Sequence, residues 1–156
     1  MNTTRRAVLK SATASGMLAG LIAAGALRPT QVLAAEWNKA AFEAKDTAGA
    51  LKGIGAGAPA DSKDLILKAP DIAENGAVVP VDVVSNIPNT SSITILVEKN
   101  PSPLSASFDF ANGALPEVSA RLKMGQTSLI KAVAKADGKF YTAQKEVKVT
   151  VGGCGG

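Results

Sequence analysis

Hydrophobic and polar residues alternate in short runs along the second part of the chain, and turn residues separate the runs. The runs cover residues 64–69, 77–85, 93–97, 104–110, 118–124, 127–136 and 139–151. A period of two is typical of strands that are buried on one face. The pair Asp137-Gly138 joins the last two runs and is a strong hairpin signal. About seven short strands with close turns predict a mainly β fold, an immunoglobulin-like antiparallel β-sandwich.

Two details of these runs add to the prediction. Pro80 lies inside the run 77–85, and because proline has no backbone donor, this run is expected to be an edge strand or to contain a bulge. Lys131 and Lys135 alternate with small apolar residues in the run 127–136. They are interpreted as a solvated strand face, with attraction of anions or an acidic partner as the alternative.

A different period precedes the strands. Apolar residues recur at spacings near three and four from Glu36 to about Gly53, which predicts an amphipathic helix. Trp37 and Phe42 on this helix either cover one edge of the core or dock on a partner. The run from Gly53 to Gly57 ends the helix and forms a loop. Its G-x-G-x-G pattern follows a helix, which is the wrong context for a dinucleotide site.

Residues 1–34 have the pattern of an export signal. A polar, basic start with Arg5 and Arg6 is followed by an apolar run rich in alanine and glycine, with cleavage expected before Ala35. The paired arginines resemble a twin-arginine signal, which exports folded proteins and would allow a second subunit to travel along. The alternative is a membrane anchor, but the run is short and Arg28-Pro29 interrupts it. The predicted organisation is therefore a signal (1–34), a helix and loop (35–60), a sandwich (61–151) and a C-terminal arm (152–156).

Charge and composition exclude several classes of function. Four of the 17 basic residues and none of the acidic ones precede residue 35, so the remaining 13 basic residues equal the 13 acidic ones. A mature domain near neutrality argues against nucleic-acid binding. The chain has no histidine and one cysteine. Catalytic triads that need histidine, histidine-containing zinc sites and internal disulfides are thus excluded.

The arm carries the one cysteine of the chain. Cys154 is flanked by Gly152 and Gly153 on one side and by Gly155 and Gly156 on the other. Glycines give the arm a small cross-section and few backbone restrictions, so it could enter a narrow channel. No neighbouring cation activates the thiol, whose ordinary pKa is about 8.5. We interpret Cys154 as a handle that carries a group, and a frayed tail with an incidental cysteine is the alternative.

The Gly-Gly-Cys-Gly-Gly tail, behind a sandwich pattern and a twin-arginine signal, closely resembles the SoxY family. These proteins are the sulfur-carrier subunits of the bacterial Sox thiosulfate-oxidising system. The resemblance implies that Cys154 covalently carries sulfur intermediates, with Gly152, Gly153, Gly155 and Gly156 as its flexible arm.

The resemblance also implies the surroundings of the protein. It would be a periplasmic carrier that is not itself an enzyme and has no cofactor or metal of its own. Its partner would be a SoxZ-like subunit in a heterodimer. It would dock transiently with a haem c-containing conjugating enzyme, a dimanganese hydrolase that releases sulfate and a molybdenum-containing sulfur dehydrogenase.

Two other functions remain open at the level of sequence. The chain could be an exported β-sandwich module that binds a partner and has an incidental cysteine. A thiol peroxidase or reductase is the weaker alternative, because no resolving cysteine, histidine or neighbouring cation is evident. Asp82, Asp109 and Glu117 are interpreted as surface charges with no visible pairing.

Overall fold

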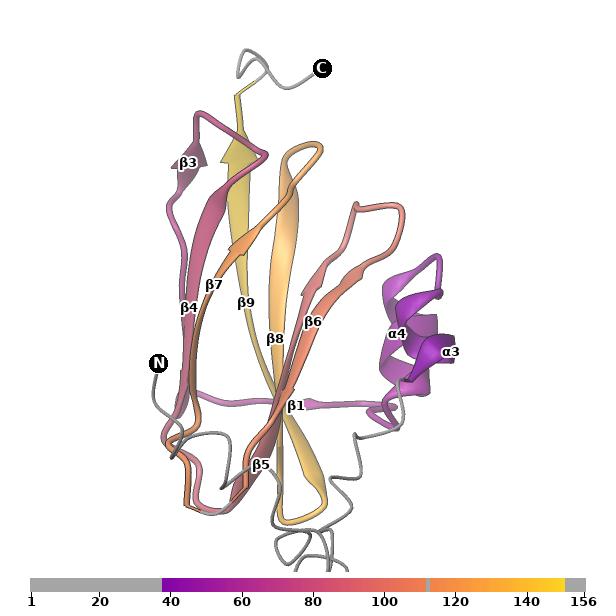
Figure 1. Cartoon of the computed structure of the whole chain (residues 1–156), viewed down its shortest axis with the longest axis vertical. Coiled ribbons are helices and arrows are strands. Elements are labelled where there is room, and N and C mark those ends of the chain that lie inside the picture. Colours follow the sequence, from indigo (N-terminus) through magenta and orange to yellow (C-terminus); the bar gives the residue numbers. More distant parts are fainter. Residues whose placement is uncertain (1–37, 112, 151–156) are drawn as a thin grey trace, which may run out of the picture. The chain divides into compact units, whose positions relative to one another are not determined.

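The structure is a computed structural model that describes residues 38–111 and 113–150. All of these residues belong to one compact unit. Within this unit, two helices precede nine strands in the part of the chain that is described (Figure 1). The elements are α3 (Lys39–Phe42), α4 (Thr47–Gly53), β1 (Ala60–Asp61), β2 (Leu65–Lys68), β3 (Ile72–Ala73), β4 (Val79–Ser85), β5 (Thr90–Val97), β6 (Leu104–Asp109), β7 (Glu117–Leu122), β8 (Ser128–Ala136) and β9 (Lys139–Val149).

The strands form two sheets, and the predicted sandwich is confirmed. The larger sheet has the order β1-β9-β8-β5-β6, and β3 also pairs with β9. The smaller sheet has the order β2-β4-β7. The long strands pair in antiparallel fashion, as expected. The short strands β1 and β3 differ, because both pair with β9 in parallel.

The core lies between the two sheets and follows the alternation seen in the sequence. Every second residue of β4 is buried from Val79 to Ser85, and β8 buries Ile130, Ala132 and Ala134 on its inner face. Burial of these side chains provides most of the favourable free energy of folding. The central members of this core are Val79, Val81, Val83, Ile93, Ile95, Val97, Ile130, Ala132, Ala134 and Val147.

The predicted hairpin between β8 and β9 is confirmed. Ala136 pairs with Lys139, so Asp137 and Gly138 form a two-residue loop. Their φ angles are 48° and 75°. Positive φ at both loop residues is the requirement of a type I′ turn, and it explains why this dipeptide occurs here.

The prediction for Pro80 was wrong. Its strand, β4, is the middle strand of the smaller sheet and shows no bulge in its pairing with β7. Proline is tolerated because β2 pairs only with residues 82–85 of β4, so this neighbour ends before Pro80. A missing donor at Pro80 therefore breaks no ladder hydrogen bond with β2.

The single predicted helix was also wrong, since the structure has two short helices. Asp46 separates them by capping α4: its side chain accepts a hydrogen bond from the backbone N–H of Gly49 at 2.6 Å. A capping side chain of this kind favours the start of a new helix. Trp37 lies outside the described residues. No helix in the described ranges is both long and apolar enough to cross a membrane.

The helices pack on the outer face of the larger sheet. Ala41 and Ala50 are fully buried against Leu96, Leu104 and Val133, and Phe42 packs at the edge of this cluster. The outer face of β8 is therefore not simply solvated, because Val133 lies between Lys131 and Lys135 and is 2% exposed. The Lys135 ammonium lies 5.7 Å from the centre of the Phe140 ring, a cation–π contact.

Candidate functional site

The predicted site residues lie outside the described part of the chain. These are Arg5 and Arg6 of the export signal, Cys154, and its neighbours Gly152, Gly153, Gly155 and Gly156. The structure does describe the strand that leads to the cysteine. β9 ends at Val149, and Thr150 is the last described residue. What the structure shows of the site is therefore how the domain holds this end of β9.

The end of β9 is fixed by hydrogen bonds to three consecutive backbone amides. Lys148 donates to the carbonyl of Asp71 at 3.0 Å, and Thr150 donates to the carbonyl of Ala73 at 3.1 Å. Between them, the amide of Val149 donates to the hydroxyl of Thr127 at 3.0 Å. Since β3 holds one edge of the strand and a side chain holds the other, the strand is anchored up to Thr150.

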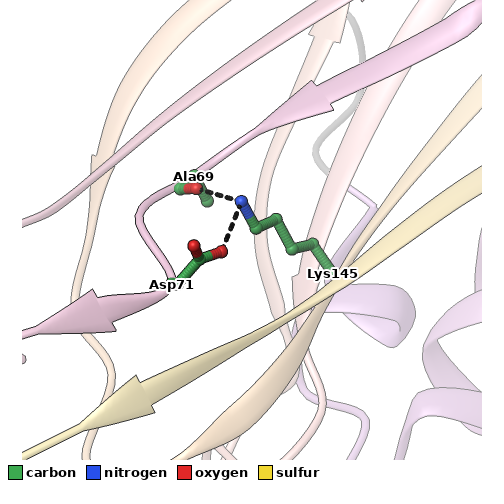
Figure 2. Close-up of polar contacts among 3 residues, drawn as sticks. All are labelled: Ala69, Asp71 and Lys145. Carbon is green, nitrogen blue, oxygen red and sulfur yellow. Dashed lines mark hydrogen bonds and ion pairs between the residues drawn. The ribbon is translucent and has the colours of Figure 1, made fainter.

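A lysine reinforces this anchor from the side. Figure 2 shows the Lys145 ammonium reaching across from β9 to the segment that joins β2 and β3. It donates to the Ala69 carbonyl at 2.6 Å and lies 3.0 Å from a carboxylate oxygen of Asp71. Asp71 is largely exposed, so the ion pair itself contributes little. The two contacts together hold the start of β3 against β9.

Gly76 allows the turn after β3 to approach this end of the domain closely. Its carbonyl accepts a hydrogen bond from the amide of Met124 at 2.6 Å. A β-carbon at position 76 would collide with the carbonyl oxygen of Met124 and come within 2.8 Å of a methyl group of Val149. A residue without a side chain is therefore required where the turn, the segment after β7 and β9 meet.

This contact gives a testable prediction. We expect Gly76→Ala to lower the free energy of unfolding by about 1–3 kcal/mol, because the added methyl group overpacks against a backbone atom that cannot easily move. Urea unfolding measures the change. Gly125→Ala is the matched control, since a β-carbon there would meet no atom within 4 Å. Equal stability of the two variants would contradict this account of Gly76.

The described residues offer little for catalysis. Residues 38–111 and 113–150 contain no cluster of three or more potential metal ligands. Asp82, Asp109 and Glu117 lie on three different strands, are exposed, and take part in neither of the two ion pairs found within these ranges. Gly53 has a packing role, because a β-carbon there would lie 2.7 Å from the α-carbon of Ala41. None of these residues is grouped with others in a way that would support catalysis.

A cavity of about 260 Å³ lies between the helices and the outer face of the larger sheet. Phe42, Leu104 and Val133 are among its apolar lining residues, and its polar lining includes Asn38, Asp109, Lys135 and several hydroxyl groups. Two of these hydroxyls, on Thr94 and Ser107, bond to each other at 3.0 Å. These two hydroxyls therefore satisfy each other within the lining.

Sequence reasoning missed the groups that anchor β9. The strands β1 and β3 are two residues long, too short to show a period. Lys145 and Ala69 are 76 positions apart, and no sequence signal connects them. The Thr127 hydroxyl lies in a segment that was predicted only as a strand.

Comparison with known proteins identifies a family. Residues 51–154 match the family model described as sulfur oxidation protein SoxY. The solved structure of the sulfur carrier protein SoxY from Chlorobium limicola f thiosulfatophilum is 42% identical, with a TM-score of 0.62 over 72% of this chain and 99% of that chain. A superoxide reductase (neelaredoxin) from Archaeoglobus fulgidus is 14% identical, with a TM-score of 0.44 over 54% of this chain and 86% of that chain. Among curated proteins, no match is found.

Proposed function

The chain belongs to the SoxY family of sulfur oxidation proteins, and from this premise we propose that it is a periplasmic sulfur carrier that holds its cargo on Cys154. Its role as a sulfur carrier in sulfur oxidation follows from the family. The attachment residue, the sulfur species and the presentation to other enzymes are the proposal. The observation that carries it is that the family match extends to residue 154, and so includes the one cysteine of the chain.

The proposed chemistry begins with thiosulfate. The Cys154 thiol and the outer sulfur of thiosulfate form a new S–S bond, and the pair loses two electrons and one proton. The electrons pass to a haem c-containing partner enzyme. The product is a cysteine S-thiosulfonate, Cys-S-S-SO₃⁻. Water then attacks the sulfonate sulfur in a hydrolase, which releases sulfate and two protons and leaves a persulfide, Cys-S-S⁻, for further oxidation.

The thiol suits a carrier better than a catalyst. A cysteine without a cationic neighbour has an ordinary pKa of about 8.5 and is mostly protonated at neutral pH. The residues nearest to Cys154 in sequence are glycines, which supply no charge. Activation of the sulfur would then come from the enzyme that receives it, and the carrier would not react unaided. The domain's contribution is to hold β9 firmly up to Thr150, so that the segment that bears Cys154 begins at a fixed point.

The partners and location complete the proposal. The family implies Sox-system partners such as SoxZ. We expect a SoxZ-like subunit in a heterodimer and transient docking to the conjugating enzyme, to a dimanganese hydrolase and to a sulfur dehydrogenase. Arg5 and Arg6 support folded export, which would allow the second subunit to travel with the chain. In this proposal the chain itself holds no cofactor, and its sulfur cargo is substrate.

Intact mass spectrometry tests the proposal. Protein purified from thiosulfate-grown cells should carry sulfur adducts that map to Cys154 by peptide sequencing. Treatment with a reducing agent should remove them, because they are joined by S–S bonds. Protein from cells grown without reduced sulfur is the control and should be largely unmodified. Free thiol alone in thiosulfate-grown cells would contradict a carrier role.

A further inference from the structure

We propose that Ile72 and Val78 form a recognition surface for the enzymes that act on Cys154, an inference that rests on the proposed function and names a partner surface for it. These two residues are called the apolar pair below. They lie at the two ends of the turn segment that begins at β3 and leads into β4. The occupant we infer is the rim of an active-site entrance, apolar where it meets the pair.

Both residues of the apolar pair are exposed to solvent. Ile72 is 57% exposed and Val78 is 49% exposed. Their neighbours Ala73 and Val79 point into the core and are almost fully buried. The pair therefore does not contribute to the core, and its apolar surface faces solvent within the described unit. Covering this apolar surface with the apolar surface of a partner would lower the free energy, because it would remove both surfaces from water.

The apolar pair lies on the segment that neighbours the end of β9. Ile72 is the register partner of Lys148, and the Ala73 carbonyl accepts the hydrogen bond from Thr150. The turn after Ala73 includes Gly76, which lies against Val149. Figure 1 shows β3 and this turn beside the end of β9. The apolar pair thus lies on the segment that anchors the last described residues of the chain.

The length of chain between β9 and the cysteine limits how far a partner enzyme can be from the domain. Cys154 lies four positions after Thr150, and a fully extended chain spans at most about 3.3–3.6 Å per residue, or roughly 14 Å in total. An enzyme that reacts with Cys154 inside a channel must therefore bring the rim of that channel close to Thr150. Because β9 is anchored there, the rim meets the surface that β3 and its turn provide.

The charges around the pair are consistent with an apolar rim. Asp71 is already engaged by Lys145, which leaves three exposed charges nearby: Glu74, Lys148, and Lys123, which follows the register partner of Val79. Their sum is a single net positive charge exposed to solvent and screened by salt, so steering by charge is weak here. Contact through the apolar pair is then the main source of affinity that this segment can supply.

The chain provides a matched control. Ile66 and Leu115 are also exposed, at 36% and 74%. Ile66 pairs with Val84, and Leu115 precedes Pro116, whose carbonyl bonds to Ser85. Both therefore lie near the end of β4 that is opposite to Val79, away from the anchored end of β9. Substitutions there change the same kind of surface without changing the proposed contact.

The experiment measures loading of the carrier as a function of its concentration. Full-length carrier, purified from its native cells, is mixed with soluble extract from a carrier-deletion strain, thiosulfate and oxidised cytochrome c. Intact mass gives the initial rate of adduct formation on Cys154. We expect the double variant Ile72→Thr/Val78→Thr to raise the apparent KM for the carrier about tenfold with kcat unchanged, since docking weakens while the chemistry is the same. Threonine keeps the β-branched shape and so the local backbone preference.

The following outcomes decide whether the apolar pair is a recognition surface. An unchanged KM in this variant, or an equal rise in Ile66→Thr/Leu115→Thr, would overturn the inference while leaving the proposed function intact. Wild-type carrier that gains no adduct would contradict the proposed function, and the inference with it. The rate of alkylation of Cys154 by iodoacetamide should be equal in all variants. A slowed alkylation in the apolar-pair variant would mean a changed arm and would count against a docking role.

Discussion

Cys154→Ser abolishes thiosulfate-dependent sulfur oxidation and leaves the fold unchanged: this is the largest effect that we expect from any single substitution. The hydroxyl of serine cannot form an S–S bond, so no sulfur intermediate can be attached. The core of residues 38–111 and 113–150 is formed without this residue, so we expect the domain to fold in the variant. Growth on thiosulfate and thiosulfate-dependent electron transfer in cell extracts measure the loss. Thermal unfolding measures the fold.

Thr150→Ser is the matched control for this prediction. It also introduces serine, lies four positions earlier and keeps the cysteine. Its backbone amide still donates to Ala73, because that bond does not involve the side chain. We expect near wild-type oxidation. Substantial activity in Cys154→Ser would show that the cysteine is incidental and would favour the partner-binding alternative.

Ile95→Ala should produce the largest loss of stability, about 2–5 kcal/mol in the free energy of unfolding. Ile95 is fully buried in β5, the strand that lies between β6 and β8 in the larger sheet. Its register partners on the two sides are Ala106 and Ala132. Because both are small, neither can fill the cavity that the substitution leaves. A loss of this size is a large fraction of the total stability of a typical domain.

Urea unfolding of the full chain measures this effect, and Ile66→Ala is its control. Ile66→Ala removes the same atoms from the exposed face of β2, where the Ile66 side chain is already in partial contact with water. We expect its effect to stay below about 1 kcal/mol. Similar losses in the two variants would mean that the core does not lie where the structure has it.

The alternation in the sequence was sufficient to predict the seven longer strands and the sandwich. The pattern works because each strand has one buried face, and burial imposes the period of two. It could not position β4 within its sheet, since a proline shows only that a donor is missing and not which neighbour ends. It could not divide the N-terminal helix either, because the apolar period continues past Asp46 and the cap depends on local backbone geometry.

The candidate site also has one part that the sequence indicates and one part that it does not. The cysteine and its glycines could be proposed from sequence because composition alone makes them exceptional, and their role stays a prediction. The anchor could not, because its parts are distant in sequence and chemically ordinary. Lys145, Thr127 and the two-residue strand β3 have no pattern of their own. Their role as an anchor is visible only in the fold, which brings them to the end of β9.

The pairing of β9 has a consequence for the order of events during synthesis. This strand lies between β8 on one side and β1 and β3 on the other, and β1 and β3 come from residues 60–73. Until residues 139–149 leave the ribosome, β8 has an unpaired edge and the two short strands have no partner. The domain therefore cannot close during translation of most of its length. The segment predicted to direct export is made first, yet the cargo that it directs would become compact only once nearly all of the described chain has emerged.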